Sequence, residues 1–166
     1  RRAQKLPWYL VLGTPQSGKK NIIHNTRLQF VKPEHFSEDA LQYIHQAPDV
    51  EWWFSQKGVF IDSLTYEAET DKASWKKLLR ILKRERKHKP LNGIVLNISI
   101  TDLMQYTNKD RQEFIHNISQ HIRDLYETFR STTPVYLVLN KCDLIEGFME
   151  FFNDLSSEEI NQIWGI

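Results

Sequence analysis

The residues best suited to chemistry form a glycine-containing loop near the start of the chain. The segment Gly13-Thr14-Pro15-Gln16-Ser17-Gly18-Lys19-Lys20 has the G-x-x-x-x-G-K spacing that cradles phosphate groups. Its glycines let backbone N–H groups and a helix N-terminus face an anion, and Lys19 would reach the β and γ phosphates. The alternative is an ordinary glycine-containing turn between a strand and a helix. The predicted phosphate-binding positions are Gly13, Ser17, Gly18, Lys19 and Lys20.

The last position of this motif departs from the pattern. A Ser or Thr hydroxyl normally binds Mg²⁺ there, whereas this chain has Lys20. An ammonium group cannot ligate a metal, and a second cation near a Mg²⁺ site would repel the ion. Lys20 could instead neutralise phosphate charge or point to solvent. The substitution therefore argues against Mg²⁺-dependent hydrolysis.

A second candidate is the carboxylate of Asp62. It ends the apolar run Val59-Phe60-Ile61, the arrangement that holds Mg²⁺ in P-loop NTPases. GTPases continue this segment as D-x-x-G, but Ser63-Leu64-Thr65 follow here, so the glycine that senses the γ-phosphate is missing. An Asp at a strand end can also be a turn or cap residue. With the phosphate loop upstream, we interpret Asp62 as a relic Mg²⁺ site.

The third candidate is the tetrapeptide Asn140-Lys141-Cys142-Asp143, which has the pattern N-K-x-D. In GTPases the Asp accepts hydrogen bonds from guanine, and the Lys stem lies along the base. Adenine would leave that carboxylate unpaired, so the motif discriminates between bases. Asn140, Lys141 and Asp143 are therefore the predicted base-binding residues. The motif is weak in isolation and gains specificity from its place after a later strand.

Two further features have both a structural and a functional interpretation. Eight of the 22 basic residues fall between Lys76 and Lys89, which suits anionic lipid but also the solvated face of a helix, the interpretation we favour. Trp52 and Trp53 would point to opposite faces of a strand, so one is expected in the core and the other could contact a partner. Cys142 and the six histidines lack the spacing of metal ligands, and we expect them to be structural.

The elements that must position these residues alternate between strands and helices. The strands are expected at 6–12, 51–54, 58–61, 93–98 and 134–139, and the helices at 19–28, 71–88, 108–130, 147–152 and 157–163. One helical turn is expected near 37–45, and 51–61 could form an antiparallel hairpin. Continuous apolar strands between amphipathic helices indicate a mainly parallel sheet with helices on both faces. The predicted fold class is α/β, of the P-loop NTPase (small GTPase-like) type.

Composition limits the classes of protein. The 166 residues carry 22 Lys+Arg and 21 Asp+Glu, are 40% hydrophobic and 12% aromatic, and include one Cys. These values fit a single globular domain and exclude disorder, and the near-neutral charge with no aromatic-basic platform argues against nucleic-acid binding. A lone cysteine allows no internal disulfide. No apolar run approaches the roughly 20 residues of a membrane span.

Together these motifs resemble the cytoplasmic domain of the IcmF/TssM family of bacterial secretion proteins. The resemblance covers nearly the whole chain. It rests on Leu6-Pro7-Trp8-Tyr9-Leu10 before the loop, Trp52-Trp53-Phe54 before Ile61-Asp62, Asn92-Gly93-Ile94-Val95-Leu96 with Asp102-Leu103, Pro134 to Leu144, and the tail from Gly147 to Gly165. Many TssM members have Thr or Ser where this chain has Lys20, and D-T-A-G where it has Asp62-Ser63-Leu64-Thr65. These departures favour IcmF of a type IVB (Dot/Icm) system over TssM of a type VI system.

The resemblance implies a location and partners. It implies that residues 1–166 are a single cytoplasmic GTPase-like domain, excised from a larger inner-membrane protein with flanking transmembrane helices. Its partners would be a DotU/TssL-like inner-membrane protein and other components of the secretion complex, and its location the cytoplasmic face of the bacterial inner membrane. No cofactor is required by the sequence, and GTP or ATP with Mg²⁺ is the candidate.

Two hypotheses about function follow. The preferred one is a domain that assembles or stabilises the secretion complex, has a degenerate nucleotide site and is not an enzyme. The rival is an active GTPase or ATPase that powers or gates assembly. Lys20 and the missing switch glycine support the first, whereas the intact Gly13, Gly18 and Lys19 and the N-K-x-D tetrapeptide support the second.

Overall fold

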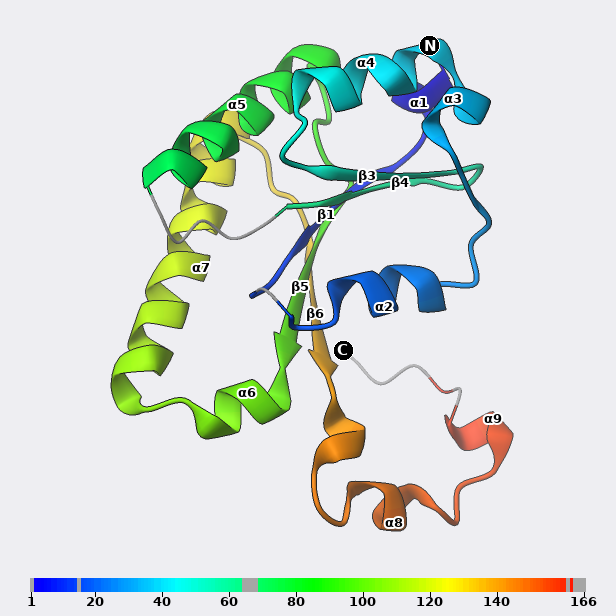
Figure 1. Ribbon diagram of the computed structural model, residues 1–166, viewed down its shortest axis with the longest axis vertical. Helices are drawn as coiled ribbons and strands as arrows, with labels where there is room; N and C mark the ends of the chain where they lie inside the picture. Colours follow the sequence, from blue (N-terminus) through cyan, green and yellow to red (C-terminus); the bar gives the residue numbers. More distant parts are fainter. Residues whose placement is uncertain (1, 15, 64–68, 161, 163–166) are drawn as a thin grey trace.

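The computed structural model describes residues 2–14, 16–63, 69–160 and 162 of the chain (Figure 1). These residues form one six-stranded sheet in the order β2-β3-β4-β1-β5-β6. The strands are β1 (Trp8–Leu12), β2 (Phe30–Val31), β3 (Glu51–Ser55), β4 (Val59–Asp62), β5 (Gly93–Ser99) and β6 (Val135–Asn140). The helical segments are α1 (Arg2–Lys5), α2 (Lys19–Asn25), α3 (Pro33–Phe36), α4 (Glu38–Gln46), α5 (Glu69–Glu85), α6 (Ile100–Gln105), α7 (Asn108–Phe129), η1 (Cys142–Leu144), α8 (Phe148–Phe152) and α9 (Ser157–Ile160).

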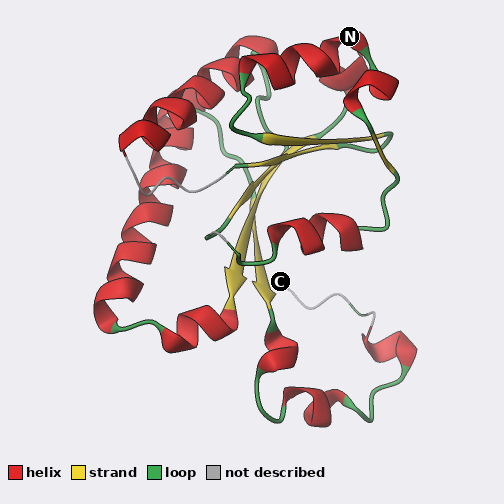
Figure 2. Ribbon diagram, in the orientation of Figure 1, coloured by secondary structure: helices red, strands yellow, loops and turns green. Residues whose placement is uncertain are grey.

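The sheet is mixed, with a parallel half and an antiparallel half. Figure 2 shows its strands together, with helices around them. Strand β1 lies between β4 and β5 and is parallel to both, and β6 extends the parallel half. The hairpin predicted over 51–61 is confirmed, because β3 and β4 pair antiparallel with Trp52 opposite Ile61. The α/β class is therefore confirmed. The predicted parallel pairing holds for the half of the sheet that carries the glycine-containing loop, and the sheet as a whole is mixed.

The core lies on one face of this sheet. Trp8, Leu10 and Leu12 of β1 point into it and meet the apolar sides of α3, α4, α5 and α7. Figure 1 shows α3, α4 and α5 together on one side of β3 and β4, with α2 on the other side. Burial of these apolar side chains is the main force that holds the helices against the sheet.

Aromatic rings fill much of this core. The Trp8 ring lies 5.1 Å from the Tyr43 ring and 5.6 Å from the Trp52 ring, edge to face in both cases. The Trp8 indole N–H donates to the Ala3 carbonyl at 2.8 Å, so its polar atom is satisfied inside the core. Helix α1, which the sequence did not predict, is thereby tied to β1.

Helix α7 begins at a capping box and carries a buried histidine. The Thr107 hydroxyl accepts a hydrogen bond from the Asp110 backbone N–H at 3.3 Å, and the Asp110 carboxylate accepts one from the Thr107 N–H at 2.9 Å. His121 is fully buried, with its Nδ1 2.6 Å from the Asn117 carbonyl oxygen and its ring 4.7 Å from Trp75 of α5. The expectation that the histidines are structural is met at this position.

Strand β6 differs from the sequence prediction. Its continuous apolar run predicted a strand covered on both faces, but its side chains are largely exposed, with Leu137 at 61% and Leu139 at 52%. The prediction was wrong here because β6 is the edge strand of the described sheet and none of its side chains belongs to the apolar core. Apolar composition shows that a strand can be buried and does not show what buries it.

Smaller differences concern the segment between α2 and β3. It contains β2 and two helices, α3 and α4, instead of the single helical turn expected near 37–45. Pro33 stands in the first turn of α3, where its missing N–H costs nothing. Among the described residues, none of the helices has the length and apolar character needed to cross a bilayer.

Candidate functional site

The glycine-containing loop lies where the motif requires. It leaves the carboxyl end of β1 at Gly13 and leads into α2 at Lys19. Gly18 stands just before the helix with φ of 86°, a left-handed conformation that disfavours a side chain. A Cβ atom at Gly18 would also overlap the Asn140 side-chain amide. Pro15 lies outside the described residues.

Lys19 points back into the protein. Its ammonium group donates to the carbonyl oxygens of Gly13 and Ser63, at 3.2 Å each, and lies 3.1 Å from Oδ1 of Asp62. The Lys19 and Asp62 side chains are only 6% and 7% exposed. Three protein oxygens therefore surround the cation that would otherwise face phosphate groups.

Two asparagine amides fix the middle of the loop. The carbonyl oxygen of Ser17 accepts a hydrogen bond from Asn97 Nδ2 at 2.8 Å and another from Asn140 Nδ2 at 3.0 Å. Asn97 Nδ2 also lies 3.1 Å from the Ser17 hydroxyl oxygen. Both Ser17 and Asn97 are fully buried. The loop is thus tied to β5 and β6 through side chains that start 80 and 123 positions away from Ser17.

Lys20 turns away from the loop and pairs with a carboxylate. Its Nζ atom lies 2.8 Å from Oε1 of Glu51, and both side chains are exposed. The hydrogen bond to Glu51 and the charge of Glu51 raise the pKa of Lys20, with a smaller contribution from the charge of Asp62. Glu51 stands directly opposite Asp62 in the β3–β4 register. The charges of Lys19 and Lys20 are therefore balanced beside the loop by the carboxylates of Asp62 and Glu51.

The N-K-x-D tetrapeptide follows β6. Asn140 turns its amide toward the loop, and its Oδ1 accepts from the Lys141 backbone N–H at 2.8 Å. Lys141 adopts a left-handed φ of 59°, and its ammonium group lies 3.6 Å from Oδ1 of Asp102 at the start of α6. Asp143 is exposed in η1. The structure brings Asn140 to the loop and leaves Asp143 open to solvent.

A magnesium nucleotide does not fit this set of groups well. Asp62 is the predicted metal ligand, but its carboxylate faces the Lys19 ammonium group, and Lys20 supplies no hydroxyl. Among the described residues, no cluster of three His, Cys, Asp or Glu side chains could hold a metal ion. Leu64 and Thr65, which replace the switch segment, lie outside the described residues.

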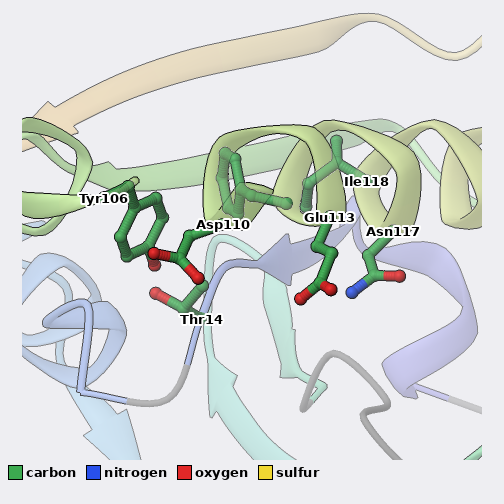
Figure 3. Close-up of a pocket in the computed structure, with 7 residues that line it drawn as sticks. Thr14, Tyr106, Asp110, Glu113, Asn117 and Ile118 are labelled. Atoms are coloured by element: carbon green, nitrogen blue, oxygen red, sulfur yellow. The ribbon is translucent and has the colours of Figure 1, made fainter. Parts of the chain in front are cut away.

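A cleft of about 210 Å³ lies between the loop and α7 (Figure 3). Thr14 of the loop forms one wall, and Tyr106, Asp110, Glu113 and Asn117 form the other. Figure 3 shows the Asp110 and Glu113 carboxylates on the side that faces Thr14. Hydrogen bonds from Thr107 lower the pKa of Asp110, so it is charged at neutral pH. This acidic cleft does not suit a phosphate group.

Sequence reasoning missed two residues that hold the loop. Asn97 interrupts the apolar run of β5, and a polar residue in a buried strand signals a specific hydrogen-bond partner. Glu51, the partner of Lys20, is an exposed residue that no motif singles out. The phosphate-loop positions, Asp62 and Asn140 do converge at one edge of the sheet.

Fold and loop thus define an α/β domain with a phosphate-loop-like turn beneath an N-K-x-D segment. A family model described as the IcmF-related N-terminal domain matches residues 68–166, and the chain belongs to this family. Over 172 aligned residues it is 34% identical to the type VI secretion system component TssM1 of Pseudomonas aeruginosa. That alignment covers 100% of the chain and 16% of TssM1, so the chain spans about a sixth of this relative. The resemblance to the IcmF/TssM family is confirmed.

Proposed function

We propose that the chain is a GTPase-like structural and interaction module of a bacterial type VI or type IVB secretion apparatus. The observation that carries this proposal is the position of Lys19, whose ammonium group is already surrounded by Gly13, Ser63 and Asp62 oxygens. A triphosphate would have to displace Asp62 from Lys19 before it could bind. The phosphate loop then serves as a structural turn that joins β1, β5 and β6.

The family supports a proposal for the setting of this module. We place the module at the cytoplasmic face of the bacterial inner membrane, where a DotU/TssL-like protein and other components of the complex would be its partners. The similarity to a type VI component supports this setting. Lys20, in place of the hydroxyl residue of many TssM members, supports the type IVB branch.

The rival function is an active GTPase or ATPase that powers or gates assembly. The left-handed Gly18 beside Asn140 and the exposed Asp143 favour it, because an active site would need both. In that case Asn140, Lys141 and Asp143 bind the base, and Lys19 binds the phosphates. Such an enzyme requires the Lys19–Asp62 pair to open.

Titration with fluorescent GTP and ATP, with and without Mg²⁺, separates the two functions. We expect no Mg²⁺-dependent binding in the micromolar range and no turnover. Micromolar Mg²⁺-dependent GTP binding with turnover, abolished by Asp143→Ala, would establish the rival. Asp143 is a suitable control because it is exposed, so its replacement should leave the fold intact.

A further inference from the structure

The solvent-exposed face of helix α5 is strongly basic. Five exposed side chains form what we call the basic face, namely Lys76, Lys77, Arg80, Lys83 and Arg84. At 3.6 residues per turn they fall within an arc of about 120° around the helix axis. The expected solvated helix face is therefore confirmed. Among the exposed residues of α5 that the structure describes, none is acidic or aromatic.

The carboxylates near the basic face leave most of its charge uncompensated. Glu85 pairs with Arg84, but the Glu85 side chain is only 6% exposed. Asp49 and Asp124, which come from neighbouring segments, accept hydrogen bonds from neutral side chains of α5 at 2.9 Å and 3.0 Å. Within the described part of the chain, no carboxylate forms an ion pair with the other four members of the basic face.

Like charges stand at neighbouring positions along this helix. Lys76 and Arg80 are four residues apart, as are Arg80 and Arg84, and like charges at this spacing destabilise a helix. A helix face that only meets water typically alternates acidic and basic residues, because opposite charges at the same spacing stabilise it. An anionic partner would remove the repulsion within the basic face.

Acidic residues gather in the last part of the described chain. Between positions 142 and 160 there is no Lys or Arg, and six residues are acidic, namely Asp143, Glu146, Glu150, Asp154, Glu158 and Glu159. Figure 1 shows α8 and α9, which belong to this acidic segment, at the end of the molecule away from α5. The acidic segment therefore does not neutralise the basic face of the same molecule. A formal net charge of only +1 thus conceals a basic end and an acidic end.

The chemistry of the basic face favours a flat anionic surface as its partner. Its described neighbours on α5 offer no exposed aromatic ring on which a nucleic-acid base could stack, and no large apolar side chain that could anchor a protein contact. Clustered Lys and Arg side chains bind anionic lipid headgroups through charge alone. A negatively charged bilayer would also repel the acidic segment, so both ends of the molecule favour the same orientation.

We propose that the basic face of α5 binds the anionic headgroups of a lipid bilayer and holds the domain with α5 toward the membrane and the acidic segment away from it. This inference rests on the proposed setting at the inner membrane and names the surface that meets the lipid. Because the contact depends on charge, salt should reverse it.

Co-sedimentation of the whole 166-residue chain with vesicles tests the binding. One set of vesicles contains equal parts of phosphatidylglycerol and phosphatidylcholine, and the other contains phosphatidylcholine alone. We expect binding to the first set only. Raising the salt from about 0.1 M to about 1 M shortens the Debye length from about 10 Å to about 3 Å and should release the protein.

Neutral substitutions on the basic face provide a second readout. The double variant Lys76→Gln with Arg80→Gln should bind the anionic vesicles about 25-fold more weakly, because each basic side chain near such a surface contributes about fivefold. The matched control is Lys57→Gln with Arg111→Gln, which removes the same charge at exposed positions outside α5 and should change the affinity less than about twofold. Circular dichroism checks that both variants keep their helices.

The orientation of the bound domain is tested with fluorescent labels on single cysteines. Cys142 is the only cysteine of the chain and begins the acidic segment. Ala73 is exposed and lies within the arc of the basic face, so Ala73→Cys with Cys142→Ser moves the label to that face. We expect energy transfer to acceptor-labelled headgroups to be stronger from position 73 than from position 142. This readout needs no change in the charge of the basic face.

Several outcomes would overturn the inference. They are equal binding to both kinds of vesicle or to neither, equal losses in the two double variants, and equal energy transfer from the two labels. Tighter binding to duplex DNA than to vesicles at equal phosphate concentration would assign the basic face to nucleic acid. Self-association that only the α5 double variant abolishes would assign it to the acidic segment of a second copy.

Co-purification with the secretion complex separates this inference from the proposed function. A full-length protein that co-purifies with the complex, while the chain fails to bind anionic vesicles, refutes the lipid contact and leaves the proposed function standing. A protein that does not co-purify refutes the proposed function, whatever the vesicles show.

Discussion

Lys19 is the residue in which the structure departs most from a working phosphate loop. In an open loop this side chain would be free to contact a ligand, and its replacement would affect binding more than folding. Here it is buried and paired with Asp62. Its removal would leave a carboxylate without a counter-charge inside the protein.

Replacement of Lys19 by Met should therefore destabilise the fold. We expect the free energy of unfolding to fall by about 3 kcal/mol, because one partner of a buried ion pair is lost. The double variant Lys19→Met with Asp62→Leu should recover much of this loss, since no buried charge remains. Urea denaturation followed by tryptophan fluorescence measures the free energy of unfolding of the single and the double variant. A Lys19→Met protein as stable as the natural one would contradict the buried pair.

Lys20 gives a test of the nucleotide site that does not depend on the core. Lys20→Thr restores the hydroxyl of the motif, which would raise the affinity for Mg²⁺-GTP if the rest of the pocket were sound. Because Asp62 still pairs with Lys19, we expect Lys20→Thr to bind Mg²⁺-GTP no better than Lys20→Ala. Isothermal titration with and without Mg²⁺ compares the two variants. An affinity about tenfold higher for Lys20→Thr would locate the defect at Lys20 and favour the rival function.

At the scale of single residues, the sequence predicted which positions lie close together, but not which hydrogen bonds and ion pairs they form. Gly18, Lys19, Asp62 and Asn140 are close together because parallel strands end at the same edge of a sheet. That Lys19 donates to protein oxygens depends on side-chain directions that spacing does not encode. Asn97 could have been found from its polarity within an apolar strand.

At the scale of secondary-structure elements, local sequence patterns were sufficient to predict some helices and strands but not others. The long helices α5 and α7 follow the apolar periodicity of the sequence closely, since both bury one stripe against the core. The short elements α1, β2, α3 and α6 were missed or merged, because segments of two to six residues are held by tertiary contacts. The exposure of β6 depends on its neighbours in the sheet and could not be read from its own residues.

The start of α7 offers a test at this scale. Thr107→Ala removes the side chain that caps the helix, and we expect it to lower the free energy of unfolding by about 1 kcal/mol. Thr107→Ser keeps the hydroxyl and should cost much less. Thermal denaturation followed by circular dichroism compares them. Equal losses for the two variants would show that the methyl group, and not the cap, stabilises this end.

At the scale of the whole molecule, His121 couples stability to pH. Burial lowers the pKa of His121, and the hydrogen bond to the Asn117 carbonyl and the charge of Asp124 only partly oppose it. The unfolded chain therefore binds a proton before the folded one as the pH falls below about 6.5. The stabilisation from neutral His121 is present above that pH and is lost below it.

This coupling predicts a slope in stability between pH 7 and 5. The free energy of unfolding should decrease as the pH falls, by up to about 1.4 kcal/mol per pH unit from this residue. His121→Gln should remove that part of the slope whatever its own stability. His116→Gln, at an exposed position of the same helix, should retain it. Urea denaturation at several pH values measures the slopes, and an unchanged slope in His121→Gln would refute the assignment.

The central place of β1 in the sheet bears on how the protein is made by the ribosome. Tyr9 of β1 pairs with Phe60 and Gly93, which lie 51 and 84 positions further along the chain. At about 5–20 residues per second, Gly93 is synthesised about 4–17 s after Tyr9. The apolar residues of β1 must wait unpaired during that interval, whereas the β3–β4 hairpin can close as soon as it emerges. Biogenesis of this domain therefore depends on keeping one early apolar segment from aggregating during translation.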